Sequence, residues 1–264
     1  MALQFPDIDP AIIRIGPIAI RWYALAYIAG LIGGWKYTKW LVARPPFAMK
    51  PDQVDDFLVW ATAGVVLGGR LGYVLFYKPL YYLNNPLEAF MVWQGGMSFH
   101  GGALGVIIAI VLYSRRHGLN LLSVGDTICA VVPLGLFFGR IANFINGELF
   151  GRAAPEDLPW AMVFPMGGPV PRHPSQLYEA GMEGLILLCV MHLLWRVPAL
   201  RLRSGLLSGA FLTGYGMARV IGEFFRQPDA HLGYLWGGAT MGQLLSIPLI
   251  IAGLVLIARA KRPA

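Results

Sequence analysis

The sequence predicts an all-α, polytopic membrane protein with about seven transmembrane helices in a single domain, residues 1–264. The chain is 56% hydrophobic and 13% charged, and its mean hydropathy of +0.58 is too apolar for a soluble domain of this length. Its apolar runs have about 20 residues, the length that an α-helix needs to cross a hydrocarbon layer of about 30 Å. The short alternating segments of a membrane β-barrel are missing from the sequence.

Turn-forming residues separate seven apolar stretches. Segments such as RPPFAMKP, KPLYYLNNP and RRHGLN contain Pro, Asn and Gly, which favour turns over a continuing helix. The predicted spans are residues 17–41, 54–77, 96–114, 122–140, 175–195, 205–225 and 238–258. The longest connection, 141–174, contains acidic and Pro-rich stretches, and we expect it to have some structure of its own.

The distribution of Lys and Arg predicts the orientation, because cytoplasmic loops usually carry the excess of basic residues. With the N-terminus outside, 12 of the 21 basic residues fall in inner connections or the span ends beside them, 7 fall in outer segments or the span ends beside them, and 2, Arg70 and Arg219, lie deeper within spans. The inner groups are Lys36, Lys39, Arg44 and Lys50; Arg115 and Arg116; Arg196, Arg201 and Arg203; and Arg259, Lys261 and Arg262. This pattern accounts for the net charge of +7 without a nucleic-acid partner.

The N-terminal segment lacks the basic start and apolar core of a cleavable signal peptide. It contains Asp7, Asp9 and several Pro residues instead. We therefore expect the first span to stay in place.

Polar residues gather at the ends of the predicted spans that face outward. Five or six of the spans direct such side chains toward the outer leaflet. The candidates for a functional site are Tyr23 near the outer end of the first span, His100 at the start of the third, Arg140, Asn143, Asn146, Glu148 and Gly151 at and beyond the end of the fourth, and Arg219 and Glu223 in the sixth.

Two arginines lie inside predicted spans, where a charge is costly, about 2.5–3.5 kcal/mol at the centre of a helix. Arg219 shares one helical face with Tyr215, Glu223 and Arg226, because these residues step by 4, 4 and 3. It either pairs with Glu223 to hold helices together or lines a polar cavity open to lipid headgroups. For Arg70 the same two interpretations stand, structural support or contact with a substrate.

The polar residues favour an anionic ligand and a proton acceptor. A planar guanidinium matches phosphate oxygens bidentately, and the commonest phosphate at this depth is a phospholipid headgroup. His100 lies between two pairs of Gly and is either a structural histidine or a group that exchanges a proton near neutral pH. His100, Glu148 and Glu223 lack the spacing of a known set of metal ligands, so we predict no metal and no cofactor.

An alternative function is an anionic lipid or solute transporter, or a lipid-binding membrane protein. A transporter is expected to have broken helices, with polar residues near the midplane of both halves. Here the polar residues gather at one leaflet and the sequence shows no internal repeat. The pattern therefore favours an enzyme.

The segment GRIANFINGELFGR, residues 139–152, resembles the signature of bacterial phosphatidylglycerol–prolipoprotein diacylglyceryl transferases. GGMSFHGGALG, RHPSQLYE and YGMARVIGEFFR are similar to other motifs of that family, and the resemblance extends from near Tyr23 to the last span. It implies transfer of the diacylglyceryl group of phosphatidylglycerol to the lipobox Cys thiol of a preprolipoprotein signal peptide, with release of glycerol 1-phosphate. It also implies a multi-pass protein of the bacterial inner membrane, whose site faces the outer leaflet of the lipid bilayer.

By motif position, the resemblance implies that His100, Arg140 and Arg219 are catalytic. The residues that it implies for substrate binding are Tyr23, Arg140, Asn143, Asn146, Glu148, Gly151, Arg219 and Glu223. The arginines would hold the charge that develops on the departing phosphate. The thiol reacts as a thiolate; either His100 takes its proton, or the field of the arginines lowers its pKa.

Overall fold

The computed structural model describes residues 2–6, 8–9, 11–16, 18–155, 157–228 and 233–260. Asp7, Lys261 and Arg262, which the sequence analysis uses, lie outside these residues. The chain forms two compact units. The first unit comprises residues 1–37 and 128–264, and the second comprises residues 38–127.

Long helices dominate the described residues. They are α1 (Trp22–Val42), α2 (Pro51–Phe76), α4 (Phe99–His117), α5 (Leu121–Ile145), α9 (Leu206–Glu223), α10 (Met241–Arg259), and a continuous stretch made of α6 (Ser175–Glu179), the π-helix η4 (Ala180–Ile186) and α7 (Leu187–Arg196). The prediction of a largely helical protein is thereby confirmed.

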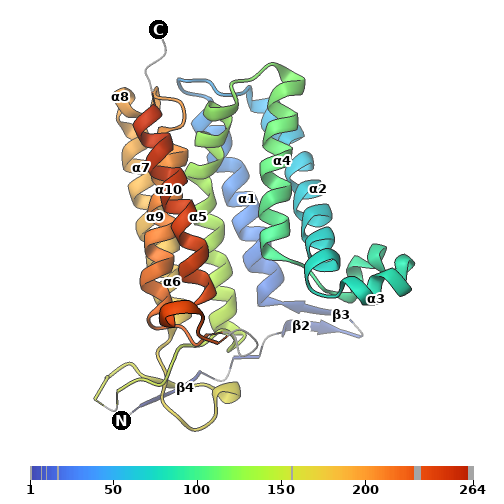
Figure 1. Cartoon of the computed structure of the whole chain (residues 1–264), viewed down its shortest axis with the longest axis vertical. Helices are drawn as coiled ribbons and strands as arrows, with labels where there is room; N and C mark the ends of the chain where they lie inside the picture. Colours follow the sequence, from blue (N-terminus) through green and yellow to red (C-terminus); the bar gives the residue numbers. More distant parts are fainter. Residues whose placement is uncertain are drawn as a thin grey trace. The chain divides into compact units, whose positions relative to one another are not determined.

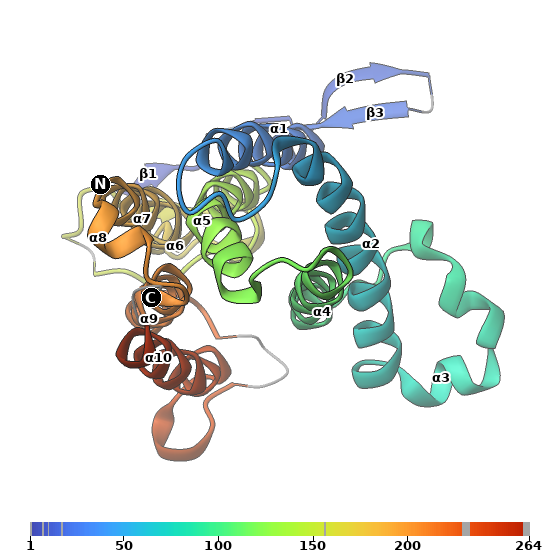
Figure 2. The same cartoon turned by 90° about the horizontal axis from the view of Figure 1, so that it is seen from above.

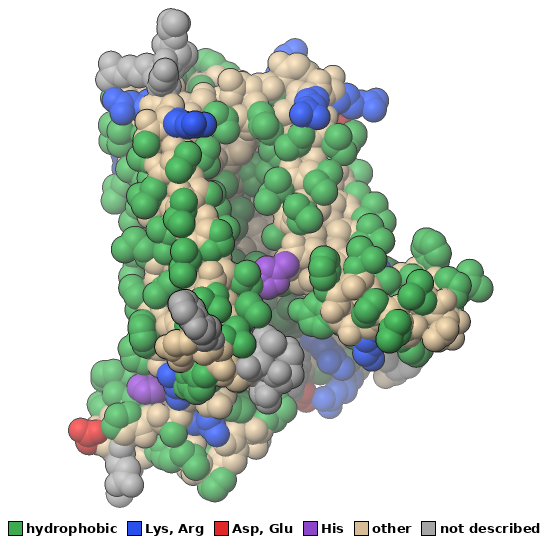
Figure 3. Space-filling model, viewed as in Figure 1, with side chains coloured by type: hydrophobic (Ala, Val, Ile, Leu, Met, Phe, Trp, Pro, Cys, Tyr) green, Lys and Arg blue, Asp and Glu red, His purple; other side chains and the backbone are tan. Residues whose placement is uncertain are grey.

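Within the described residues, four helical segments are long and apolar enough to cross a membrane, namely Pro51–Phe76, Leu121–Ile145, Ser175–Arg196 and Met241–Arg259. On the face shown in Figure 3, hydrophobic side chains cover the length of the helices, while Lys and Arg side chains lie near their ends. This distribution is typical of a membrane protein. The total of seven spans, the orientation and the single domain stay predictions.

The first predicted span begins too early. Residues 18–21 belong to β3 (Ile18–Arg21), which pairs antiparallel with β2 (Ala11–Ile15), and the helix begins only at Trp22. Gly16 has a φ of +58° in the turn between the strands, a conformation that glycine adopts without strain. Apolar content made this strand indistinguishable from the helix that follows it.

Other boundaries also differ from the prediction, three of them near the candidate site residues. Helix α4 begins at Phe99 rather than at residue 96, because the Ser98 side chain accepts a hydrogen bond from the Gly101 N–H and caps the helix. Helix α5 continues past residue 140 to Ile145, and α9 ends at Glu223, so Arg226 lies beyond the helix. In α5, the helix continues through polar residues that lie beyond the apolar run detected by sequence hydropathy.

Short elements connect the helices. They are α3 (Pro79–Asn84), η1 (Pro86–Phe90), η2 (Val92–Gln94), η3 (Pro165–Gly167), α8 (Pro198–Arg201), η5 (Trp236–Gly238), and the strands β1 (Leu3–Gln4) and β4 (Met162–Val163), which pair in parallel. These strands qualify the expectation of an all-α fold. Through β1 and β4, the N-terminal segment is fixed to the long connection between α5 and α6.

In the second unit, helices α2 and α4 lie side by side (Figure 1 and Figure 2) because glycines allow their backbones to approach. A Cβ atom on Gly105 would overlap the carbonyl oxygen of Gly64, and one on Gly68 would overlap the carbonyl oxygen of Gly101. Such contacts between small residues are the usual way in which helices associate in lipid.

Replacing Gly105 with Ala is therefore expected to destabilise the second unit by about 1–3 kcal/mol, the usual cost of overpacking, although Ala is the better helix former. The neighbouring Gly102→Ala is the control, because its Cβ would lie 3.6 Å from the nearest atom, the carbonyl oxygen of Val65. Thermal unfolding of both variants in detergent measures the difference. Equal stability of the two proteins would contradict this packing.

Arg70 organises the segment that precedes α4. Its Nε donates to the carbonyl oxygen of Ala89 (2.8 Å), Nη1 to those of Gly95 (2.6 Å) and Gly96 (3.1 Å), and Nη2 to that of Glu88 (2.5 Å). The residue is only 5% exposed. Of the two interpretations of Arg70, structural support is the one that these contacts favour.

In the first unit, α9 and α10 lie side by side (Figure 2), and Gly209 and Gly253 permit their close approach. Helices α7 and α9 contribute buried apolar side chains to the core of this unit, namely Leu187, Met191, Trp195, Leu207 and Phe211. This packing holds α6, η4 and the end of α9 in place, and these elements carry the site described next.

Candidate functional site

Among the described residues of the first unit, six charged side chains form a buried network, which we call the ion-pair cluster. It consists of Arg140 from α5, Glu179 from α6, Glu183 from η4, Arg219 and Glu223 from α9, and Arg226 just beyond α9. The Glu179 and Glu183 side chains are fully buried. A buried carboxylate needs such partners, because an unpaired charge in a low-dielectric interior is very unfavourable.

Arg140 contacts two carboxylates. Its Nε and Nη2 donate to Oε2 of Glu183 at 3.1 and 2.9 Å, and Nη1 forms an ion pair with Oε2 of Glu179 at 2.9 Å. The Arg140 side chain keeps 16% of its surface exposed. It is therefore fixed in orientation without being sealed off from its surroundings.

Arg219 occupies the other side of the same carboxylates. Its Nη1 donates to Oε1 of Glu179 at 3.0 Å, and its Nη2 pairs with Oε1 of Glu223. Arg226 lies at the margin, with Nη1 3.6 Å from Oε1 of Glu179. Glu179 thus bridges all three arginines and holds together guanidinium groups that would otherwise repel one another.

The backbone brings these side chains together through two close approaches. A Cβ on Gly184, within the π-helix η4, would come within 2.6 Å of the Phe137 Cβ, so only glycine lets η4 lie against α5 beside Arg140. In the same way, Gly242 of α10 leaves room for the Glu223 carboxylate, 2.6 Å from where its Cβ would be. Single π-helical turns of this kind are frequent at functional sites.

Both central arginines retain hydrogen-bond donors. A guanidinium carries five N–H groups, two on each terminal nitrogen and one on Nε. The contacts of Arg140 leave one N–H group on Nη1 and one on Nη2. The close contacts of Arg219 leave its Nε and one N–H group on each of Nη1 and Nη2. Tyr215 lies within electrostatic range of Arg140 and Arg219. The cluster can therefore bind an anion in addition to its own carboxylates.

The turn after α5 is closed by its own side chains. Nδ2 of Asn143 and Nδ2 of Asn146 donate to the same oxygen, Oε1 of Glu148, at 2.8 and 3.3 Å. Nε2 of Gln176 donates to the Glu148 carbonyl oxygen at 2.7 Å and ties the turn to α6. Leu149 has a φ of +56°, which few non-glycine residues adopt. Three of the predicted site residues are thus in direct contact.

Gly151 lies where three backbone segments meet. Its N–H donates to the His173 carbonyl oxygen at 2.9 Å, and its Cβ would come within 2.6 Å of the Phe225 carbonyl oxygen. Beside it, Arg152 donates from Nε and Nη2 to the carbonyl oxygens of Arg226 and Glu223, both at 2.8 Å. Arg152 therefore caps the C-terminus of α9, where a cation is favourable.

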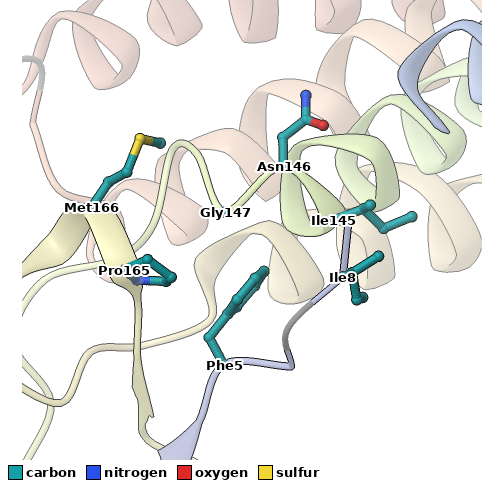
Figure 4. A pocket seen from close by; sticks show the side chains of 7 residues that line it. All are labelled: Phe5, Ile8, Ile145, Asn146, Gly147, Pro165 and Met166. Carbon is teal, nitrogen blue, oxygen red and sulfur yellow. The ribbon is translucent and has the colours of Figure 1, made fainter. Parts of the chain in front are cut away.

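A cavity of about 320 Å³ lies beside this turn (Figure 4). Its lining comes from the N-terminal segment, the end of α5 and η3, and comprises Phe5, Ile8, Ile145, Asn146, Gly147, Pro165 and Met166. The walls are mostly apolar, and Asn146 supplies the one side-chain amide.

The other two predicted site residues are Tyr23 and His100. Tyr23, in the first turn of α1, lies within electrostatic range of Glu148 and Arg140. His100, in the first turn of α4, is exposed and contacts the Phe99 ring, with centroids 5.7 Å apart. All the predicted site residues except His100 belong to the first unit.

His173 is half-buried, and burial lowers the pKa of its imidazole below the usual value of 6.5. The unfolded chain therefore binds a proton more readily, so stability is expected to fall as the pH drops below 6.5 toward the pKa of the folded state. Thermal unfolding at pH 7 and pH 5 should show a smaller loss in His173→Gln than in the unchanged protein. Equal losses would exclude this contribution.

The sequence analysis missed Glu179 and Glu183, the two buried carboxylates that position Arg140 and Arg219. It treated Glu223 as the partner of Arg219, and that pair is present, but it is one of several. The available signal was the spacing of four between Glu179 and Glu183 within an apolar span, where two acidic residues on one face require cations nearby.

Comparisons with known proteins match this chain over nearly its whole length. The sequence model of the prolipoprotein diacylglyceryl transferase family matches residues 10–259. A phosphatidylglycerol–prolipoprotein diacylglyceryl transferase of Paramagnetospirillum magneticum is 72% identical over 261 residues, covering 99% of this chain and 97% of that protein. Proteins of the same name from Rhodospirillum rubrum and Gluconacetobacter diazotrophicus are 62% and 60% identical over 263 residues, with 99% of this chain covered and 95% and 94% of theirs.

Proposed function

We propose that this protein moves the diacylglyceryl group of phosphatidylglycerol onto a preprolipoprotein. The chain belongs to the prolipoprotein diacylglyceryl transferase family, and it is therefore a transferase of a bacterial membrane. The acceptor is the thiol of the lipobox cysteine, which follows the apolar core of a signal peptide. The protein crosses the inner membrane about seven times, with the N-terminus and the site on the outer side.

The observation that carries this proposal is the orientation of Arg140 and Arg219. Buried carboxylates hold both guanidinium groups while leaving N–H donors for an anion. A phosphate diester offers two oxygens that match such donors. Because the donors are held in place before the lipid arrives, they lose little freedom when charge builds on the phosphate.

The reaction is a displacement at carbon. The cysteine sulfur attacks the carbon of the diacylglyceryl group that bears the phosphate ester. A C–S bond forms there, and the C–O bond between this carbon and the phosphate breaks. The electron pair of that bond leaves on the phosphate oxygen, so the products are a thioether and glycerol 1-phosphate. His100 is our candidate to accept the thiol proton, since imidazole exchanges protons near neutral pH.

The turn at Glu148 supports the proposed recognition of the headgroup. Asn143 and Asn146 hold one carboxylate oxygen of Glu148, and the other oxygen is suited to accept a hydrogen bond from a glycerol hydroxyl. Tyr23 lies near the same carboxylate. Gly151 keeps the turn compact, and Glu223 fixes Arg219.

The test is transfer of labelled diacylglyceryl from phosphatidylglycerol to a lipobox peptide by the purified protein. We expect thioether on the Cys peptide and none on a matched Cys→Ser peptide. Equal labelling of both peptides would contradict the thiol mechanism, and no labelling of either would contradict the transferase function. An anion transporter, the alternative function, would instead produce flux into sealed liposomes without any peptide product.

A further inference from the structure

We propose that the ion-pair cluster selects a phosphate that carries one negative charge over one that carries two, and that Glu179 and Glu183 are the specificity-determining residues. This inference rests on the proposed function, because it takes the cluster to be the phosphate site. It assigns a role to two carboxylates that are not themselves implied by the signature motif.

The cluster is electrically balanced. The cations Arg140, Arg219 and Arg226 face the anions Glu179, Glu183 and Glu223. Outside the cluster, the cations Arg152 and Arg172 and the anion Glu148 lie around the turn after α5. From the cluster itself, an arriving phosphate therefore meets oriented donors but no surplus of positive charge.

Because the cluster is buried, its charge balance has a strong effect on the binding of an anion. The side chains of Glu179 and Glu183 are fully buried, so water screens their repulsion of an anion poorly. A monoanion gains hydrogen bonds from the remaining N–H groups of Arg140 and Arg219. A dianion meets the same donors, and its second charge adds repulsion from both carboxylates.

The substrate and the product differ in the charge of their phosphate group. Phosphatidylglycerol is a phosphate diester with a single negative charge. Glycerol 1-phosphate is a monoester with a second pKa near 6, so at pH 7 it is mostly a dianion. A neutral cluster thus holds the lipid headgroup and favours departure of the product once the C–O bond has broken.

The unchanged protein provides the first test. Binding of glycerophosphoglycerol, a diester, and of glycerol 1-phosphate is measured with purified protein at pH 5.5 and pH 7.5, without peptide and without turnover. We expect the diester to bind equally at both pH values, since its charge is constant. The monoester should weaken by roughly twentyfold at pH 7.5 if only its monoanion binds, given a second pKa of about 6.

The diester also reports any titration of the protein itself, because both ligands meet the same side chains. Around the phosphate these are the cluster residues, Tyr215 of α9, Tyr23 of α1, and Glu148, Arg152 and Arg172 at the turn. If the monoester binds as tightly at pH 7.5 as at pH 5.5, or more tightly, the proposal is wrong. Since no transfer is involved, failure of the transferase function would appear separately, as absence of thioether.

A variant provides the second test. Glu183→Gln preserves shape but leaves the cluster with one positive charge in excess, so the preference for the diester at pH 7.5 should shrink. Asp55→Asn is the matched control, because Asp55 pairs with Lys39 at an exposed position; its preference should equal that of the unchanged protein. A folded Glu183→Gln protein with unaltered preference would refute the role of this carboxylate, and if it does not fold, the pH comparison still decides.

Discussion

Replacing Arg140 with Lys is expected to lower diacylglyceryl transfer by about 10²-fold or more, the usual effect of removing one preorganised donor from a charge-stabilising site. Lys keeps the positive charge but loses the planar fork. It can no longer contact Glu183 through two nitrogens and Glu179 through a third while presenting donors to an anion. The loss should appear in kcat, because the charge to be stabilised develops in the transition state.

The control is Arg14→Lys, the same substitution in an exposed pair with Asp9, whose two side chains lie 2.8 Å apart. Surface pairs contribute little, so transfer by this variant should be unchanged. Both variants are compared at equal folded concentration, using the lipobox peptide assay. Near-normal turnover by Arg140→Lys would mean that the residue only supports the structure.

Replacing Gly151 with Ala should abolish transfer and destabilise the turn that follows α5. The added Cβ would overlap the carbonyl oxygen of His173 and come within 2.6 Å of that of Phe225. Backbone atoms cannot rotate away, so one of the hydrogen bonds that join this turn to α9 must break. Overpacking of this kind typically costs about 1–3 kcal/mol, and the shift also moves Glu148 and the cap that Arg152 supplies to α9.

Gly139→Ala is the matched control within the same signature. Its Cβ would meet no described atom within 4 Å, and the residue is inside helix α5, where Ala is the better helix former by about 1 kcal/mol. Transfer and thermal unfolding are measured for both variants. If Gly151→Ala were as active and stable as Gly139→Ala, the close backbone approach at this turn would not be required for transfer, and the prediction would be wrong.

Sequence analysis identified residues whose placement in lipid is energetically unfavourable, a property that can be read from the sequence alone. Arg219 within an apolar span, and the polar residues after α5, are unusual in lipid wherever their partners lie. The contact of Asn143 and Asn146 with Glu148 was within reach as well, because these residues are close in the chain. Residue roles beyond these contacts came from the resemblance and stay proposals.

Other features were decided by distant partners. Arg70 was ambiguous because its ligands are main-chain carbonyls of residues 88–96, and carbonyls carry no sequence signal. The strand at residues 18–21 was assigned to a helix because apolar content alone does not distinguish the two structures. Sequence analysis assigned no role to Glu179 or Glu183, yet they provide the counter-charges of the site.

The sequence by itself determined that the chain is a helical membrane protein, that it belongs to this transferase family, and that costly arginines lie in its apolar spans. Only the tertiary structure decided what those arginines contact. Glu183 lies 43 positions from Arg140, and Glu179 lies 40 from Arg219. Pairing across such separations follows from helix packing through glycines and a π-helical turn, since side-chain electrostatics depend on distances in space that local sequence does not specify.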